Sequence, residues 1–232
     1  MARRRHSNRK RRRGSFGFLY KVLSLLVICG AIVAALTLFF RVNTIVVTGQ
    51  ERYTQDQIIE ASGVGVDDNL FLLNKYAVAG NIRTALPYVD EIRINRKLPD
   101  TLLIEIKECG TPMAVVQDGF AWLVSPSGRV VEQLDAAQAE GYAVISGCTL
   151  LAPSVGTRLA LATEYAAQQQ SLLDLMAALE AAGLTEQVQA IRLDDLSMLV
   201  MEYAGRFSVE LPYGADYERK LRALVQVVEQ LE

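Results

Sequence analysis

The sequence has almost no histidine and few cysteines, and both shortages restrict its chemistry. Its single histidine, His6, lies in a run of arginines, so the rest of the chain has no imidazole for a Ser–His–Asp triad or a histidine metal site. Outside the apolar segment that contains Cys29, only Cys109 and Cys148 remain, and a metal site needs more ligands. The sequence therefore predicts no catalytic, cofactor-binding or metal-binding residues and a protein that is not an enzyme. Whether Cys109 and Cys148 pair is left open, because a sequence does not give their separation.

Acidic side chains are absent from residues 1–41, which contain ten of the 24 Lys and Arg residues. Residues 42–232 carry the other 14 basic side chains and all 26 acidic ones, so their net charge is −12 although the chain as a whole has −2. Such a division of charge is typical of a basic tail that contacts a membrane or a nucleic acid.

A long uncharged segment decides between those two partners. Residues 22–40 are 19 consecutive residues without a charge, and as a helix they would extend about 28 Å, close to the thickness of a bilayer core. Nine basic residues precede this segment and only Arg41 follows it directly, which predicts a single-pass protein with a cytoplasmic N-terminus. The lipid bilayer explains the basic tail, so we expect no nucleic-acid partner. A cleaved signal peptide or a buried soluble helix remains the alternative.

The chain after the span begins with a pattern typical of a small α/β domain. We predict a strand at 43–48, helices at 54–61 and 74–86, and strands around 92–95 and 102–107. Thr54 and Gln57 have the spacing of a capping box, and Asn74 is a favourable cap for the second helix. The order βααββ predicts a two-layer domain with helices on one face of the sheet.

The remainder predicts a mostly β second domain with two helices. Alternating apolar residues and Gly-containing turns predict strands at 114–116, 121–125, 130–133, 144–145, 189–193, 198–203 and 207–211. Helices are expected at about 162–182 and from about 215 to the end. The fold class is therefore α+β, with a tail at 1–21, a transmembrane helix at 22–40, a first domain at 41–110 and a second at 111–232.

Several motifs could suggest chemistry, but their contexts favour turns. Gly63-Val64-Gly65 follows a predicted helix, whereas a dinucleotide-binding loop follows a strand. Asp67-Asp68 and Asp194-Asp195 are adjacent pairs, and adjacent side chains on an extended chain point apart. Ser7 and Lys10 have nucleophile–base spacing but lie in the basic tail.

Three groups of motifs occur in order along the outer part. The first domain contains Val47-Thr48-Gly49, Leu86-Pro87-Tyr88-Val89 and the run Ile92-x-Ile94-x-Arg96-x-Leu98-Pro99-Asp100-Thr101-Leu102-x-Ile104-x-Ile106-x-Glu108. The second contains Ser127-Gly128-Arg129-Val130-Val131 and Val144-Ile145-Ser146-Gly147, and Tyr217–Leu224 follow near the end. Together they resemble the FtsQ/DivIB family of bacterial cell-division proteins, which implies a POTRA domain (a small βααββ module) followed by a β domain.

The resemblance also implies how such a protein works. It implies a scaffold in septum assembly that binds other membrane proteins of the division complex, the divisome, including small bitopic coiled-coil proteins. We predict partner contacts at Tyr217, Arg219 and Arg222, while the alternative is a helix that only packs through Leu221, Leu224, Val225 and Val228. Family members usually continue into a further strand that helps to bind the coiled-coil partner, whereas this sequence ends at Glu232 inside the last predicted helix.

We therefore predict a non-enzymatic scaffold in the cytoplasmic membrane, located at the septum and without a small-molecule substrate. Exposed sheet edges would bind partners by β-augmentation, in which the partner adds a strand. A membrane-anchored sensor and a POTRA protein of secretion machinery are the alternatives. For Arg96 we favour a structural role at the Leu98–Thr101 turn over partner contact.

Overall fold

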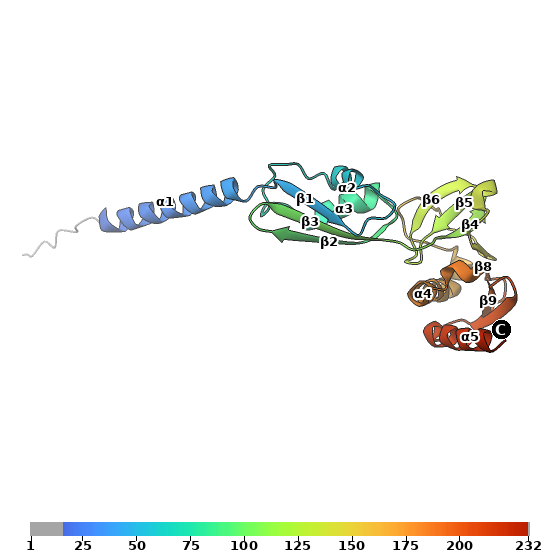
Figure 1. The fold of residues 1–232 in the computed structure, drawn as a ribbon. Coiled ribbons are helices and arrows are strands. Elements are labelled where there is room, and N and C mark those ends of the chain that lie inside the picture. The colour runs from blue at the N-terminus through green and yellow to red at the C-terminus, as the bar shows by residue number, and fades with distance from the viewer. Residues whose placement is uncertain (1–15, 232) are drawn as a thin grey trace, which may run out of the picture.

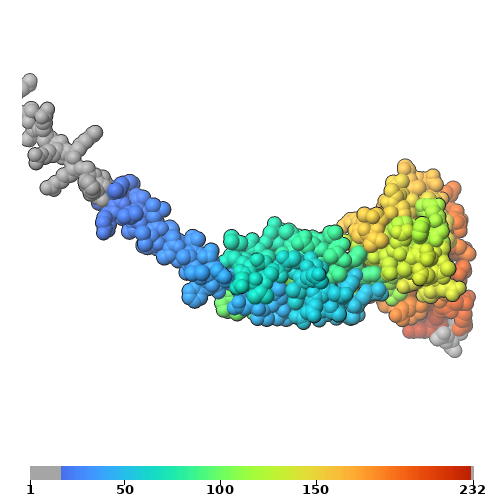
Figure 2. Space-filling view, turned by 90° about the horizontal axis from the view of Figure 1, so that it is seen from above, coloured from blue at the N-terminus to red at the C-terminus, as the bar shows by residue number. Residues whose placement is uncertain are grey.

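A computed structural model of the chain describes residues 16–231, so the predicted tail up to residue 15, with His6, lies outside the described residues. A long helix, a small α/β domain and a larger β domain follow one another in a row (Figure 1). The space-filling view shows the same elongated arrangement from above (Figure 2). This architecture has the predicted α+β class.

Helix α1 (Phe16–Phe39) contains all but the last residue of the predicted membrane span. It begins six residues before that span and includes Lys21. Residues Gly17–Phe39 form a helix long and apolar enough to cross a membrane, and all of them are exposed. An exposed apolar helix of this length is consistent with a transmembrane anchor, since exposed apolar surface of this extent is unfavourable in water.

The first domain has the predicted order of elements. It contains β1 (Thr44–Thr48), α2 (Gln55–Ser62), α3 (Lys75–Ala85), β2 (Val89–Lys97) and β3 (Thr101–Glu108). The sheet order is β1-β3-β2, with β1 parallel and β2 antiparallel to β3. Both helices lie on one face of this sheet (Figure 1). Ile58 and Ile82 of these helices share a buried core with Ile104 of β3.

The capping residues predicted from the sequence determine where both helices begin. The Thr54 hydroxyl accepts a hydrogen bond from the Gln57 amide, and the Gln57 side chain accepts one from the Thr54 amide, which completes the capping box. Asn74 accepts hydrogen bonds from the amides of Tyr76 and Ala77. These contacts satisfy amide groups that the first turn of a helix leaves without partners.

The second domain is built on one seven-stranded mixed sheet with the order β10-β9-β8-β7-β4-β5-β6. Its strands are β4 (Met113–Gln117), β5 (Phe120–Val124), β6 (Val130–Asp135), β7 (Val144–Ser146), β8 (Val188–Arg192), β9 (Met198–Tyr203) and β10 (Phe207–Pro212). The neighbours β4, β7 and β8 are parallel, and the other pairs are antiparallel. Short 3₁₀ turns that the sequence did not predict lie at η1 (Ala136–Ala139), η2 (Thr163–Tyr165) and η3 (Thr185–Gln187).

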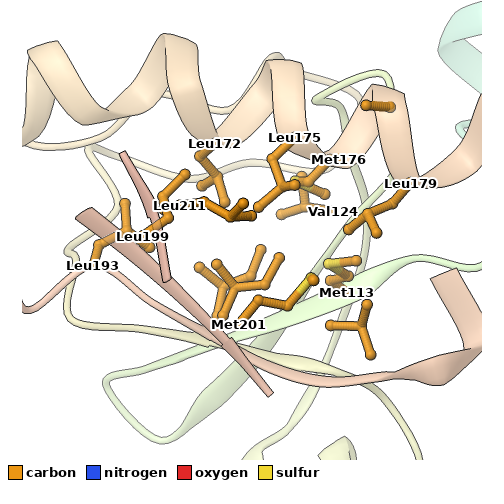
Figure 3. Packing of buried hydrophobic residues seen from close by; sticks show 14 of the residues in the cluster. Met113, Val124, Leu172, Leu175, Met176, Leu179, Leu193, Leu199, Met201 and Leu211 are labelled. Carbon is orange, nitrogen blue, oxygen red and sulfur yellow. The ribbon is translucent and has the colours of Figure 1, made fainter. Parts of the chain in front are cut away.

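Two helices pack against this sheet. Helix α4 (Ala166–Ala182) begins after η2, later than the predicted residue 162, and ends at Gly183 in the left-handed conformation. Its buried side chains Leu172, Leu175, Met176 and Leu179 lie above those of the sheet, including Met113, Val124, Leu199 and Met201 (Figure 3). Helix α5 (Tyr217–Leu231) lies beside α4 and contributes Tyr217 and Leu221 to the same core.

Candidate partner-binding surface

One edge of the large sheet is formed by β10, and the other by β6. Strand β10 pairs with β9 from Phe207↔Tyr203 to Pro212↔Met198, and no described strand pairs with its other side. The side chains of Ser208 and Glu210 are exposed, whereas Leu211 is buried. An edge strand of six residues offers backbone donors and acceptors to a strand from another protein.

Helix α5 follows this edge strand and has two different faces. Tyr217 is 4% exposed, and its hydroxyl donates a hydrogen bond to the Pro212 carbonyl oxygen over 3.1 Å. Leu221 is buried, and Leu224, Val225 and Val228 pack at the margin of the core. The packing alternative considered for this helix is therefore present on its inner face.

The structure separates the three residues predicted to contact a partner. Arg219 and Arg222 lie on the exposed face of α5, while the Tyr217 side chain lies in the core and holds the start of the helix against the end of β10. Among the described residues, neither arginine has an acidic group within ion-pair distance, so both guanidinium groups face solvent. The partner contacts remain a prediction, and only the two arginines lie where a protein could reach them.

Sequence reasoning did not single out the exposed residues of β10. Ser208 and Glu210 have no chemical pattern of their own, and the edge position of β10 follows only from the sheet order. A groove of about 520 Å³ also lies between α4 and α5, lined by Asp174, Ala177, Ala178, Ala181, Ala215, Asp216, Tyr217 and Glu218. Its acidic rim gives this side of the helix pair a charge opposite to that of Arg219 and Arg222.

Apart from this surface, a cluster of polar side chains joins the two outer domains. The Tyr88 hydroxyl donates a short hydrogen bond to the Glu132 carboxylate, and the Arg52 guanidinium lies 3.9 Å from the centre of the Tyr88 ring. The Glu108 carboxylate accepts hydrogen bonds from the amides of Glu51, Arg52 and Tyr53 at 2.7–3.1 Å. Burial and the bond to Glu132 both raise the pKa of Tyr88, so its proton stays in this contact at neutral pH. The cluster positions the domains relative to each other.

The residues considered for chemistry serve as turn and packing residues. Asp68 accepts a hydrogen bond from the Gly65 amide within the loop after α2. Asp195 accepts one from the Ser197 amide at 2.6 Å, as side chains do in Asx turns. Arg96 donates a hydrogen bond to the Leu73 carbonyl oxygen at 2.6 Å, so its structural contact is with the loop before α3 and not with the Leu98–Thr101 turn.

The cysteines and acids assemble no centre within residues 16–231. In that part of the chain, no group of three His, Cys, Asp or Glu side chains could hold a metal ion. Cys109 and Cys148 are free thiols, and burial raises the pKa of each to about 11. A thiol protonated at neutral pH is a weak nucleophile and a weak metal ligand.

The fold thus defines a class of protein: a chain whose apolar N-terminal helix fits a membrane anchor, followed by a βααββ domain and a mixed-sheet domain. A family model described as "POTRA domain, FtsQ-type" matches residues 40–108. A second, described as "Cell division protein FtsQ/DivIB, C-terminal", matches residues 114–232, which is more than half of the chain. The chain belongs to the FtsQ/DivIB family of cell-division proteins.

Similar proteins carry the corresponding names. The cell division protein FtsQ of Geotalea daltonii is 27% identical over 84% of this chain and 70% of its own length. The FtsQ of Corynebacterium glutamicum is 37% identical over 38% of this chain and 39% of its own. The cell division protein DivIB of Clostridium tetani is 31% identical over 42% of this chain and 36% of its own.

Proposed function

We propose that this protein is a non-enzymatic bitopic scaffold of the bacterial divisome, which binds other division proteins through its outer region to support septum assembly. The observation that carries this proposal is the match of residues 114–232 to the FtsQ/DivIB C-terminal domain, behind an apolar N-terminal helix. A scaffold needs accessible surfaces and no converging reactive groups, and the edge of β10 with the exposed face of α5 provides such a surface.

The topology belongs to the same proposal. Residues 1–21 form a basic cytoplasmic tail, 22–40 the transmembrane helix, 41–110 the POTRA domain and 111–232 the β domain outside the cytoplasm. The distribution of basic residues supports this orientation, since ten lie in residues 1–41 without an acidic residue. We place the protein at the division septum because of its family.

Localisation tests the divisome role directly. A fluorescent protein fused to the N-terminus should gather at mid-cell in dividing cells, and this enrichment should appear before constriction is complete. Uniform membrane labelling throughout the cell cycle contradicts the proposal and favours a membrane-anchored sensor.

The partner surface is tested with photo-crosslinking residues at the two edges of the large sheet. A crosslinker at Ser208 in β10 should capture another division membrane protein, identified by mass spectrometry. The matched control is Gln133, an exposed residue of β6 at the opposite edge. Equal capture at both positions would show that the β10 edge is not the specific site.

The arginines of α5 are tested by charge reversal. Arg219→Glu with Arg222→Glu should weaken the captured complex about tenfold, because charged contacts at interface rims contribute roughly 1 kcal/mol or more together. Arg158→Glu, an exposed arginine elsewhere in the same domain, serves as the control. Unchanged binding of the double variant would remove these residues from the site.

A further inference from the structure

The end of α1 is attached to the POTRA domain by backbone contacts. The Val42 amide donates to the Asp68 carbonyl oxygen at 2.8 Å, the Asp67 amide to that of Val42 at 2.9 Å, and the Leu70 amide to that of Phe40 at 2.9 Å. Val42 itself is fully buried in the domain core. Because only Phe40 and Arg41 separate this anchored residue from the last residue of the helix, the domain is held close to the end of the span.

Side chains reinforce this attachment. The side-chain Nδ2 of Asn69 donates to the Leu36 carbonyl oxygen at 3.1 Å, which satisfies an acceptor in the last turn of α1. The Phe40 and Phe71 rings meet edge to face with centroids 4.9 Å apart, and Arg41 forms an ion pair with Asp67 over 3.8 Å. The loop from Asp67 to Phe71 therefore lies against the point where α1 ends.

Large apolar side chains are exposed at this same end of the domain. We call Val66, Phe71, Leu72, Tyr76 and Leu98 the apolar tip, and their exposed fractions are 68%, 46%, 79%, 91% and 58%. The first three belong to the loop that contacts α1, and Tyr76 lies in the first turn of α3, directly after it.

Leu98, the fifth residue of the apolar tip, lies in the turn between β2 and β3. The Asn43 amide donates to the Asp100 carbonyl oxygen at 2.9 Å, and Arg96 bonds the Leu73 carbonyl oxygen, so this turn lies beside both the exit of α1 and the loop before α3. In Figure 1 the β2–β3 turn lies at the end of the domain nearest α1. Exposed apolar residues scattered singly need no explanation, but a group at one end of a domain indicates a contact surface.

The length of the apolar helix indicates how far the apolar tip lies from the centre of the bilayer. From Val22, the first residue after Lys21, to Phe39 the helix has 18 residues and rises about 27 Å, close to the ~30 Å of a bilayer core. The boundary of the hydrocarbon region therefore falls near Phe39 and Phe40. Phe71, which packs on Phe40, lies at this boundary, where aromatic residues are favourable.

We propose that the apolar tip docks on the membrane in which α1 is embedded, inserting Leu72 and Tyr76 among the lipid headgroups. The occupant is the bilayer interface itself, because the tip is continuous with the helix that crosses it. Lys75 and Lys97 lie next to tip residues and are placed to meet lipid phosphates. The POTRA domain then stands on the membrane in a fixed orientation and directs the β domain away from it.

Tryptophan fluorescence in proteoliposomes of the full chain tests this docking. Trp122 is the only tryptophan, so a Trp122→Phe background accepts a new probe by Leu72→Trp. Lipids brominated near the headgroup end of the acyl chain should quench roughly half of the Leu72→Trp emission, since interfacial side chains insert only ~5–10 Å. A control Val116→Trp probe, at an exposed apolar position of the β domain, should keep its emission.

Equal quenching of the two probes, or none at Leu72→Trp, would overturn the proposal. The vesicles contain no other protein, so quenching there cannot come from a partner that covers the tip. A second measurement uses Leu72→Asp with Tyr76→Asp, which should broaden the distance distribution between a spin label on the β domain and labelled lipids. The pair Leu151→Asp and Val155→Asp, at exposed positions of the β domain, is the control.

This inference depends on α1 crossing the membrane but not on which division proteins the chain binds. A chain that docks but fails to gather at mid-cell would contradict the divisome role alone, and a septal protein with an unquenched tip would contradict the docking alone.

Discussion

Tyr88 shows how one side chain connects two domains. It lies at the end of the loop that follows α3, and it is 6% exposed because it packs among Ala114, Ala121 and Leu123 of the second domain. Its hydroxyl bonds Glu132 on β6 while its ring faces Arg52 of the first domain. Glu132 is half-buried, so the Tyr88 hydroxyl replaces part of the water that would otherwise hydrogen-bond its carboxylate.

Tyr88→Phe should lower the free energy of unfolding by about 1.5–3 kcal/mol, because it removes a hydrogen bond to a charged acceptor. Urea denaturation followed by circular dichroism measures the change. Tyr76→Phe is the matched control and should have almost no effect, because Tyr76 is 91% exposed. A loss of equal size in both variants would show that the Tyr88 hydroxyl contributes nothing particular.

The free thiols should react slowly. With a pKa raised by burial to about 11, Cys109 and Cys148 are roughly one-thousandth ionised at pH 8, about a hundredfold less than a thiol at the ordinary value of 9. In a Cys29→Ser chain, labelling by a thiol reagent should accelerate about tenfold for each pH unit up to pH 11.

The raised pKa also means that the folded state retains protons which the unfolded state releases, so the free energy of unfolding should fall as pH rises from 9 to 11. Rapid labelling at pH 7 would contradict the burial of both thiols.

At the scale of elements, several glycines are required by positive φ together with a close neighbour. Gly49 ends β1 with φ +86°, and a Cβ atom there would lie 2.0 Å from the Ile106 carbonyl oxygen of β3. Gly119, in the predicted hairpin between β4 and β5, also has positive φ, but a Cβ atom would meet nothing within 4 Å. Alanine at Gly119 would therefore introduce backbone strain alone, whereas alanine at Gly49 would introduce the same strain and a steric clash with β3.

Gly49→Ala should destabilise the protein by roughly 2–4 kcal/mol, since left-handed strain adds to a displaced sheet backbone. Gly119→Ala should cost only about 1–2 kcal/mol, from strain alone. Thermal or chemical denaturation of both variants compares them. If the two losses were equal, the contact of Gly49 with β3 would not matter.

Most elements could be predicted because their signals are local. The capping box at Thr54, the cap at Asn74 and the glycine at residue 183 depend on neighbours within one helical turn, and all three are present. Leu103 differs, because it alternates with Leu102 and Ile104 and so points to the opposite face of the sheet, yet it is 7% exposed. It pairs with Asn95 of the adjacent strand β2 on one side and with Val46 of β1 on the other, and only the β1 neighbour comes from a distant part of the sequence.

The whole molecule is an elongated arm, and polar contacts join its two outer domains (Figure 1). Besides the Tyr88 cluster, the Gly110 amide donates to the Glu180 carboxylate of α4 over 3.1 Å. Both contacts lie at the joint, the short connection between β3 and β4, because Gly110 belongs to it and the Cys109 amide donates to the Tyr88 carbonyl oxygen. An arm fixed at both the membrane and this joint would present the β10 edge at a constant distance from the bilayer.

Combining Tyr88→Phe with Glu180→Ala should loosen this joint. Distances between spin labels on the exposed surfaces of the two domains should broaden relative to the unaltered protein, because both polar links are removed. Tyr76→Phe with Glu186→Ala changes exposed residues of the same types and should leave the distribution narrow. An unchanged distribution in the first pair would assign the rigidity to apolar packing alone.

The sequence by itself determined the membrane span, the two-domain order, the helix caps and the family, because uncharged length, periodicity and local motifs carry those signals. Only the tertiary structure decided that β10 forms a free edge, that Tyr217 is buried while Arg219 and Arg222 are exposed, and that the apolar tip gathers beside α1. Those features depend on which distant segments meet. Which segments meet is set by the packing of whole elements against one another, and no single stretch of sequence contains that information.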